Sequence, residues 1–325
     1  MKAWMIREPG GPEKFALEEI DTPKARPGWT LIRVRAFGLN RSEWFTRNGD
    51  SPTVRFPRVL GIECVGEIVD SGDLHLKPGT KVAAIMGGMG REFDGSYAEY
   101  TLVPNACLFP VETQLPWERF AALPEMLQTT HGSLHVGLEI DGAESILIRG
   151  GTSSIGLAAL ALAKKAGLRV GATTRNSSKV SHLKKAGADE VWIDNGRIHE
   201  QMEERAFSLY DRVLELIGTS TLPDSLRCAG RGGIVCMTGI LGGKWTMENF
   251  KPMDDIPTGV KLTSYSGEAN DLRIEQLQEY VSLVEEGNLA VETGPVFEFE
   301  ELIQAHELMD ANRAGGKIVV LGRQS

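Results

Sequence analysis

A glycine-rich turn at residues 150–156 joins a short apolar segment to a stretch that is rich in Ala, Leu and Lys. Residues 146–149 have the length of a buried strand, and residues 155–166 have the composition of a helix. Where a strand turns directly into a helix, the first N–H groups of that helix lack partners and can face an anion. The sequence therefore predicts an α/β domain with an anion-binding turn in the middle of the chain.

Strands and helices alternate beyond this turn. Short apolar segments predict strands at 169–173, 191–193, 212–217 and 233–237, and helical patterns separate them at 177–186, 198–207 and 222–229. Such alternation is typical of right-handed βαβ units. We therefore expect a doubly wound parallel sheet of the Rossmann type.

The two ends of the chain have a different pattern. Strand-like segments at 30–36, 64–69, 80–85 and 96–103 lie between turn signals such as Pro27-Gly28. The last sixty residues add helical patterns at 271–286 and 300–312 and a strand at 317–321. Because 325 residues are many for one core, we expect two domains, one α/β and one mostly β.

Composition excludes several classes of protein. A net charge of −9 without a block of basic residues argues against a nucleic-acid partner. No apolar run is long enough to span a bilayer, and the charged first residues do not form a signal peptide, so we expect a cytoplasmic protein without a membrane partner. The cysteines are too scattered for a zinc site and are expected to be free and buried: Cys64, Cys107, Cys228 and Cys236.

The turn partly matches the dinucleotide-binding fingerprint G-x-G-x-x-G. Gly151 is expected to make the sharp turn and Gly156 to let the helix pack closely, whereas Ser153 replaces the middle glycine. The alternative is a structural turn that binds no ligand. The predicted cofactor-binding residues of the turn are Gly151, Thr152, Ser153, Ser154, Ile155 and Gly156.

The end of the second strand predicts which dinucleotide is bound. Thr174 stands where an NAD-specific site has Asp or Glu for the ribose 2′-hydroxyl. Arg175 and Lys179 can instead bind a 2′-phosphate, with Ser178 as a hydroxyl donor. The cofactor expected from this pattern is NADPH, and the alternative is a solvated basic loop.

Two kinds of catalytic centre are not supported by the sequence. No tyrosine is followed four residues later by lysine, so the Tyr/Lys pair of some reductases is missing. His131 and His135 have the spacing of metal ligands on a helix, but Gly132 stands where a metalloprotease has Glu, and we prefer a packed or exposed histidine pair. The remaining possibility is a cofactor that transfers hydride to a substrate that is already activated.

Ordered motifs along the chain resemble the medium-chain dehydrogenase/reductases, and among them the zinc-free quinone oxidoreductase branch. The motifs lie at 36–42, 61–66, 76–79, 95–100, 186–188 and 316–321, in addition to the glycine turn. The resemblance implies a mostly β, GroES-like catalytic domain at 1–121, completed by 265–325, and a Rossmann domain at 122–264. Asn40, Ile62 and Met126 stand where zinc enzymes carry their ligands, and residues 86–94 lack the cysteines of a structural zinc lobe.

Without zinc, alcohol oxidation is disfavoured, whereas quinones and α,β-unsaturated carbonyls accept hydride readily. We therefore expect an NADPH-dependent enzyme for a small quinone or carbonyl substrate. Two alternatives remain open. One is an enoyl-type reductase of a specific alkenal or ketone, and the other is an NADPH-binding protein with little turnover that acts structurally or as a sensor.

The resemblance also implies positions for the substrate and the nicotinamide. Asn40 and Ser42 would hydrogen-bond the substrate carbonyl in the cleft between the domains, although both can equally be satisfied turn residues. Thr130 would line the same site. The nicotinamide would contact Met237, Thr238 and Gly239. A tyrosine that some relatives have near this segment is absent, and Ser51 lies nearby.

The segment 259–266 predicts a further strand at the edge of the sheet. Exposed edges must be covered or paired. In the resembled family two cofactor domains pair there, so we expect a homodimer with two-fold symmetry. The alternative is that residues 244–255 fold back over the edge.

Overall fold

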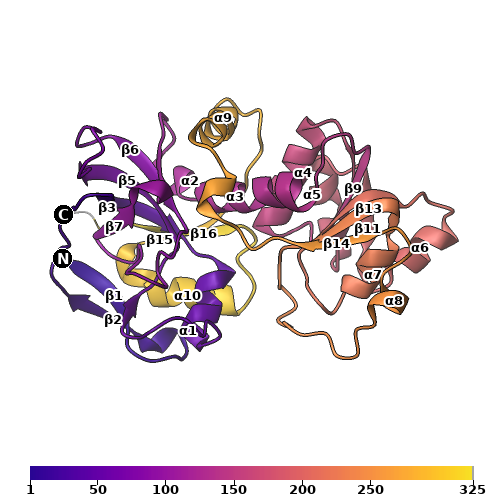
Figure 1. Cartoon of the computed structure of the whole chain (residues 1–325), viewed down its shortest axis with the longest axis horizontal. Helices are drawn as coiled ribbons and strands as arrows, with labels where there is room; N and C mark the ends of the chain where they lie inside the picture. The colour runs from indigo at the N-terminus through magenta and orange to yellow at the C-terminus, as the bar shows by residue number, and fades with distance from the viewer. Residues whose placement is uncertain (324–325) are drawn as a thin grey trace. The chain divides into compact units, whose positions relative to one another are not determined.

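The computed structural model describes residues 1–323, which form two compact units (Figure 1). Unit 1 contains residues 1–128 and 268–288 and continues from residue 292 onward, and unit 2 contains residues 129–267 and 289–291. The predicted domains, 1–121 with 265–325 and 122–264, differ from this division at 122–128, 265–267 and 289–291. The first difference arises because the division falls inside a continuous helix, α3 (Pro124–Gly132), and not at a turn.

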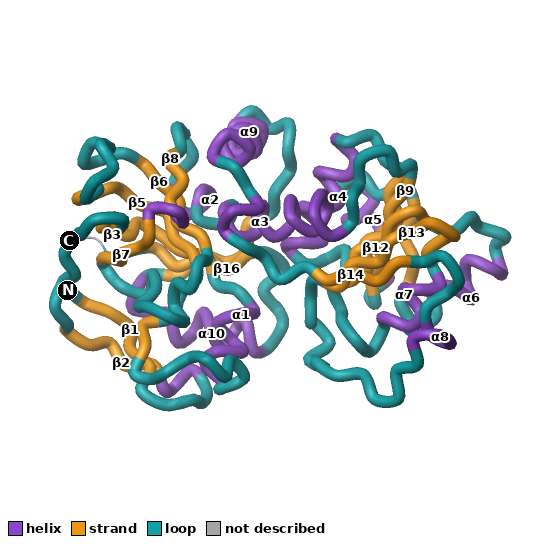
Figure 2. Tube along the Cα trace, viewed as in Figure 1, coloured by secondary structure: helices purple, strands orange, loops and turns teal. Residues whose placement is uncertain are grey.

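Unit 2 is built on a parallel sheet, drawn orange in Figure 2, and its strand order is β11-β10-β9-β12-β13-β14. Counted from β9, this order is 3-2-1-4-5-6, that of a dinucleotide-binding Rossmann fold. The predicted doubly wound parallel sheet is confirmed, and each predicted strand overlaps an observed one. The strands are β9 (Ser145–Arg149), β10 (Arg169–Thr174), β11 (Glu190–Ile193), β12 (Tyr210–Glu215), β13 (Ala229–Met237) and β14 (Lys261–Ser264).

Helices cover both faces of this sheet (Figures 1 and 2). One face carries α4 (Ser154–Lys165) and α5 (Val180–Lys185), and the other carries α6 (Ile198–Glu204), α7 (Leu222–Arg227) and α8 (Pro252–Asp255). The second face packs around the buried side chains of Trp192, Tyr210 and Leu226. The chain enters unit 2 through α3, which continues as a π-helical turn at Ser133–Gly137.

Unit 1 contains two sheets. The larger has the order β15-β16-β3-β5-β6-β8 with β7 also paired to β3, and only its pair β15 and β16 is parallel. Its strands are β3 (Trp29–Gly38), β5 (Glu63–Asp70), β6 (Lys81–Ile85), β7 (Tyr100–Pro104), β8 (Leu108–Pro110), β15 (Thr293–Phe297) and β16 (Lys317–Leu321). The smaller sheet, which the sequence did not predict, has the order β2-β1-β4 and consists of β1 (Lys2–Ile6), β2 (Phe15–Glu19) and β4 (Arg58–Val59).

The helices of unit 1 are α1 (Arg41–Asn48), α2 (Trp117–Phe120), α9 (Ile274–Glu285) and α10 (Leu302–Asp310). The apolar core of this unit surrounds Phe37, Tyr97 and Phe299. All four cysteines of the chain are free and buried, as predicted. Among residues 1–323, no helix has the length and apolar character that crossing a bilayer requires.

A buried polar cluster joins the starts of α1, α3, β5 and β16 in unit 1. The Nζ atom of Lys317 lies 2.7 Å from Oε1 of Glu63 and 2.9 Å from Oε2 of Glu125. Lys317 also donates a hydrogen bond to Oδ1 of Asn40. The Nδ2 atom of Asn40 in turn donates to Glu63 at 3.1 Å and to Glu43 at 3.3 Å. Lys317 thus forms ion pairs with two carboxyl groups, and the amide of Asn40 connects this cluster to a third, that of Glu43.

Burial changes the ionisation of Glu43 in this cluster. Its carboxyl group accepts hydrogen bonds from the backbone N–H groups of Asn40 at 3.0 Å and Ile62 at 3.1 Å. Burial nevertheless raises the pKa of Glu43 to about 7, because the loss of hydration outweighs these bonds and the attraction of Lys317. Burial alone would lower the pKa of Lys317, but the neighbouring carboxylates raise it, so the lysine stays charged.

We predict a pH-dependent loss of stability that Glu43→Gln removes. The folded-state pKa of Glu43 lies above the ordinary 4.5, so its contribution to stability is present below pH 4.5 and is lost as pH rises through about 7. The free energy of unfolding of the wild type relative to Glu43→Gln should fall by about 2 kcal/mol between pH 5.5 and pH 8. Urea unfolding at the two pH values measures this difference.

Glu13→Gln serves as the control, because this side chain is exposed. Its free energy of unfolding should follow that of the wild type between the two pH values. A Glu43→Gln variant that also follows the wild type would show that Glu43 is ionised throughout this range.

Candidate functional site

The turn after β9 is made possible by three glycines with different roles. Gly150 has a left-handed φ of 89°, so the prediction that Gly151 makes the sharp turn is wrong by one residue. Gly151 instead lets the turn lie against β10, since a Cβ there would be 3.0 Å from Cβ of Ala172 and 3.2 Å from the carbonyl oxygen of Thr173. The predicted close packing at Gly156 is confirmed, because its Cβ would lie 2.4 Å from the carbonyl oxygen of Gly150.

Ser153, which replaces the middle glycine of the fingerprint, is the N-cap of α4. Its Oγ accepts the N–H of Gly156 at 3.0 Å and donates to the carbonyl oxygen of Gly150 at 2.8 Å. A serine is preferred at this position because its side chain satisfies an N–H group that the helix leaves free. The mismatch with the fingerprint therefore has a local structural reason.

Three further backbone N–H groups of the turn remain available. Within residues 1–323, the N–H groups of Thr152, Ser154 and Ile155 have no hydrogen-bond acceptor. All three residues are only partly buried, and Ser154 and Ile155 begin a twelve-residue helix whose N-terminus carries partial positive charge. The donors fit the pyrophosphate of a dinucleotide, which is an anion of matching size and charge.

The loop after β10 presents cations and no carboxylate. Thr174 is buried at the end of the strand, and its Oγ1 accepts the N–H of Asn176 at 3.2 Å. Arg175, Ser178 and Lys179 are exposed, and the last two lie in a short 3₁₀ turn at Ser177–Lys179. These residues can bind a phosphate, and that role stays a prediction.

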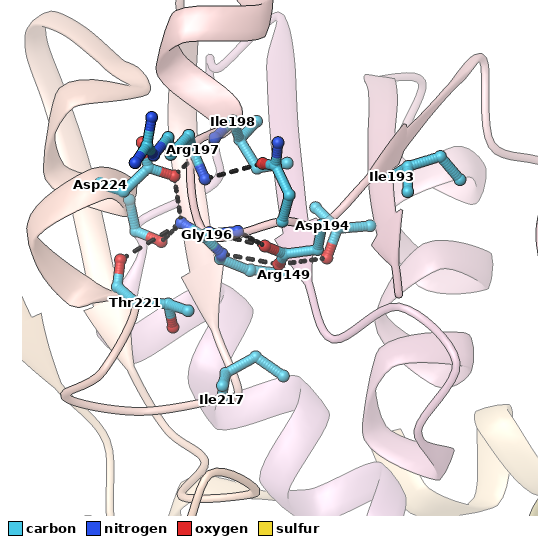
Figure 3. A network of polar contacts seen from close by, with 12 residues as sticks. Arg149, Ile193, Asp194, Gly196, Arg197, Ile198, Ile217, Thr221 and Asp224 are labelled. Atoms are coloured by element: carbon cyan, nitrogen blue, oxygen red, sulfur yellow. Dashed lines mark hydrogen bonds and ion pairs between the residues drawn. The ribbon is translucent and has the colours of Figure 1, made fainter. Parts of the chain in front are cut away.

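Arg149, the last residue of β9, is completely buried beneath the turn and is surrounded by acidic side chains (Figure 3). Its Nε and Nη2 donate to the two carboxylate oxygens of Asp194, both at 2.9 Å. Its Nη1 lies 2.6 Å from a carboxylate oxygen of Asp224 and 3.2 Å from the carbonyl oxygen of Thr221. Burial alone would lower the pKa of Arg149, but the hydrogen bonds and charge of Asp194 raise it overall.

Glu215, at the end of β12, completes this buried network. Its carboxyl group accepts hydrogen bonds from the hydroxyls of Thr221 at 3.0 Å and Ser225 at 2.6 Å, and from the N–H groups of Ile217 and Gly218. Burial raises the pKa of Glu215 despite these bonds. The carboxyl ends of β9, β11 and β12 are therefore tied together by charged side chains.

The end of β13 also lies at the carboxyl edge of the sheet of unit 2. The N–H groups of Thr238 and Gly239 both donate to the carbonyl oxygen of Glu215, at 3.0 and 3.1 Å. The hydroxyl of Thr238 is 2.9 Å from that of Ser133. Met237, Thr238 and Gly239 are partly exposed, and their contact with nicotinamide stays a prediction.

The predicted substrate-binding residues are found in different surroundings. The side-chain amide of Asn40 bonds to Glu43, Glu63 and Lys317 in the buried cluster. The Oγ of Ser42 accepts a hydrogen bond from Arg91. Thr130 is fully buried in α3. Their roles toward a substrate stay predictions.

The positions of the expected zinc ligands carry other side chains. Ile62 and Met126 are buried apolar residues. The rings of His131 and His135 pack against each other with centroids 4.4 Å apart. Among residues 1–323, no group of three or more His, Cys, Asp and Glu side chains is arranged to hold a metal ion.

The buried charged residues were missed by the sequence analysis. Arg149 ends an apolar strand, Asp194 directly follows the apolar end of β11, and Glu215 follows two apolar residues of β12. Lys317 likewise begins the apolar strand β16. A charged residue directly beside the apolar segment of a strand was the signal that could have identified these residues.

Comparisons with known proteins agree with this architecture. Residues 26–113 match the alcohol dehydrogenase GroES-like domain, and residues 186–320 match a family described as zinc-binding dehydrogenase. A quinone oxidoreductase of Pseudomonas aeruginosa is 30% identical over 96% of this chain and 97% of its own. An acryloyl-coenzyme A reductase of Metallosphaera sedula is 24% identical over 98% and 99%.

The fold is also that of a solved enzyme. The crystal structure of Escherichia coli quinone oxidoreductase complexed with NADPH superimposes with a TM-score of 0.85 at 20% identity, covering 99% of this chain and 100% of that one. The predicted combination of a Rossmann-type sheet and a GroES-like domain is thereby confirmed. The chain belongs to the medium-chain dehydrogenase/reductase superfamily, in its quinone oxidoreductase-like branch.

Proposed function

We propose that this protein is an NADPH-dependent oxidoreductase that transfers hydride to a quinone or an α,β-unsaturated carbonyl without zinc. The observation that carries the proposal is the free N-terminus of α4. Three N–H groups without acceptors in the described chain follow a Rossmann strand, and a basic loop without a carboxylate follows the next one. Membership of a family of oxidoreductases supports the same conclusion.

Each part of the cofactor has a set of residues that fits it. The N–H groups of Thr152, Ser154 and Ile155 bind the pyrophosphate. Arg175 and Lys179 bind the 2′-phosphate as charges, with the Ser178 hydroxyl as a further donor. The residues at the end of β13, Met237, Thr238 and Gly239, face the nicotinamide through backbone groups. The Escherichia coli quinone oxidoreductase was crystallised as a complex with NADPH, which supports this choice of cofactor.

The bound nicotinamide supplies a hydride, and the protein residues position and polarise the acceptor. Ser42 and Thr130 offer hydroxyl groups to the substrate carbonyl. Asn40 serves the same purpose if its amide exchanges one of its bonds in the buried cluster for the substrate. A conjugated acceptor needs no metal, because its π-system spreads the charge that develops on the oxygen.

The names of the relatives support a conjugated substrate. Similar curated proteins include several quinone oxidoreductases and an acryloyl-coenzyme A reductase. Both names refer to a conjugated electron acceptor. A reductase specific for one enone or enoyl compound is therefore the second candidate function.

We further propose that two copies of the chain form a dimer through β14. This strand pairs with β13 on one side and, within residues 1–323, with no strand on the other. Lys261 and Ser264 are exposed on it. An unpaired edge is a template for a second strand, and two-fold pairing of identical edges satisfies both copies. The segment 244–255 has its own packing partners, since Met247 and Phe250 contact the apolar core of unit 2.

We predict that the purified protein oxidises NADPH when quinones or α,β-unsaturated carbonyls are supplied, and that saturated alcohols with NADP⁺ give no comparable rate. Steady-state absorbance at 340 nm over a panel of quinones, enals and enoyl thioesters measures this. A chelator should leave the rate unchanged, and elemental analysis should find no stoichiometric zinc. Tight NADPH binding without turnover on any acceptor would support a sensor or structural role.

We predict that NADPH binds at least about tenfold more tightly than NADH, because a charged contact to phosphate is worth about 1.5 kcal/mol or more. Arg175→Ala should weaken NADPH binding about tenfold and leave NADH binding within about twofold. Fluorescence titration of both cofactors tests this. Arg227→Ala, which removes an exposed arginine from α7, is the matched control and should change neither affinity. Equal affinities in the wild type would contradict the assignment of NADPH.

We predict a dimeric mass by light scattering at micromolar concentration, and a monomeric mass for Leu262→Pro. Proline in β14 removes a backbone donor and distorts an edge that has to pair. Circular dichroism confirms that the variant is folded. A dimer that persists in the folded variant would place the interface elsewhere, and a monomeric wild type would reject the dimer.

A further inference from the structure

Thr173 holds the first two N–H groups of the glycine turn. Its Oγ1 accepts the N–H of Gly150 at 3.1 Å, and its carbonyl oxygen accepts the N–H of Gly151 at 3.1 Å. Thr173 lies on β10, next to β9 in the sheet, and is buried. The N–H groups of Thr152, Ser154 and Ile155, which follow in the chain, are those that remain available to a ligand. The position of those donors therefore depends on a side chain of the neighbouring strand.

The hydroxyl of Thr173 is oriented by the buried charges. A hydroxyl has one hydrogen, and that of Thr173 points to Oδ2 of Asp194 at 3.3 Å. The lone pairs of Oγ1 are then left for the N–H of Gly150. Asp194 is itself held by two hydrogen bonds from Arg149, at 2.9 Å each (Figure 3). The contacts thus lead from Arg149 to Asp194, from Asp194 to Thr173, and from Thr173 to Gly150, which directly follows Arg149 in the chain.

This closed chain of contacts restricts the conformation of the glycine turn. Gly150 is in the left-handed region, where a glycine is free to adopt other conformations, so its N–H needs an external partner to fix its direction. Asp224 holds Arg149 from the opposite side at 2.6 Å, and it also accepts the N–H of Ile198 at 2.8 Å. The guanidinium is therefore anchored to both α6 and α7, and the turn is anchored to the guanidinium.

We propose that Thr173 and the Arg149–Asp194 ion pair are positioning residues for the pyrophosphate-binding turn, which hold its N–H groups in the geometry that a dinucleotide requires. The inference rests on the proposed function, because it assumes that a dinucleotide binds there. It differs from the proposed role of Arg175 in one testable respect. The pyrophosphate is common to NADPH and NADH, so a loosened turn weakens both cofactors equally, whereas loss of Arg175 weakens only NADPH.

The test uses Thr173→Val and Thr173→Ser as a matched pair. Valine keeps the shape and removes the hydroxyl, and serine restores the hydroxyl. We expect Thr173→Val to raise the Kd of NADPH and of NADH by about fivefold each, the effect of one lost hydrogen bond. Thr173→Ser should stay within about twofold of the wild type. Fluorescence titration well below the melting temperature measures both constants, and KM for NADPH should rise while kcat stays unchanged.

Thr221→Val is the control within the same network. The Thr221 hydroxyl donates to Glu215 at 3.0 Å and has no contact with Gly150 in the described structure. Its removal should lower the melting temperature and leave both Kd values unchanged. The double variant Thr173→Val with Asp194→Asn should bind both cofactors no more weakly than whichever single variant has the lower affinity. The reason is that both substitutions interrupt the same chain of contacts.

The outcomes separate the inference from the proposed function. If the wild type binds neither dinucleotide, the proposed function fails. If the wild type binds them and Thr173→Val binds both as tightly, or loses NADPH alone, the positioning role is rejected. If Thr221→Val loses as much affinity for the dinucleotides as Thr173→Val does, the loss follows from lower stability in general, and the positioning role is also rejected.

Discussion

The glycine turn and the first residues of α4 carry three backbone N–H groups that no acceptor in the described chain satisfies, and the surrounding contacts keep them in that state. Ser153 accepts a hydrogen bond from the N–H of Gly156, and Thr173 accepts hydrogen bonds from the N–H groups of Gly150 and Gly151. A free donor at a partly exposed helix end costs little, because water can reach it, and an anion can replace that water. The strand order, the packing of α4 and the left-handed glycine all serve this one geometry.

Each unit also contains a buried cation surrounded by more carboxyl groups than it can neutralise. In unit 2 Arg149 is surrounded by Asp194, Asp224 and Glu215, and in unit 1 Lys317 forms ion pairs with two glutamates and attracts a third, Glu43. Burial raises the pKa of Glu43 and of Glu215 in these clusters. The excess acid is therefore accommodated by protonation or by many accepted hydrogen bonds. Such clusters connect the ends of several elements, and removing one partner leaves a buried charge uncompensated.

The parallel sheet was predictable because short apolar segments mark its strands and helical patterns separate them. The unpredicted sheet β2-β1-β4 has no such signal: β4 has two residues, and Phe15 is the only fully buried side chain of β2. The turn was located correctly, but the left-handed residue was assigned to Gly151. Two adjacent glycines look alike in sequence, and only the contact of Gly151 with Ala172 distinguishes them. The glycine pattern located the turn but none of the charged residues beneath it, because the partners of those residues are up to 76 residues away.

Two neighbouring threonines on β10 lie on opposite sides of a division in the proposed site. One side concerns the pyrophosphate that both dinucleotides share, and the other concerns the 2′-phosphate that only NADPH carries. Successive side chains of a strand point to opposite faces. Thr173 is directed to the turn and to Asp194, whereas the hydroxyl of Thr174 contacts the backbone of the following loop at Asn176. The charge of residues from 174 onward, and with it the proposed preference for a 2′-phosphate, can therefore change without disturbing the donors that we propose for the pyrophosphate. On the proposed function, the buried side would support the binding of either dinucleotide, and the exposed loop would select between them.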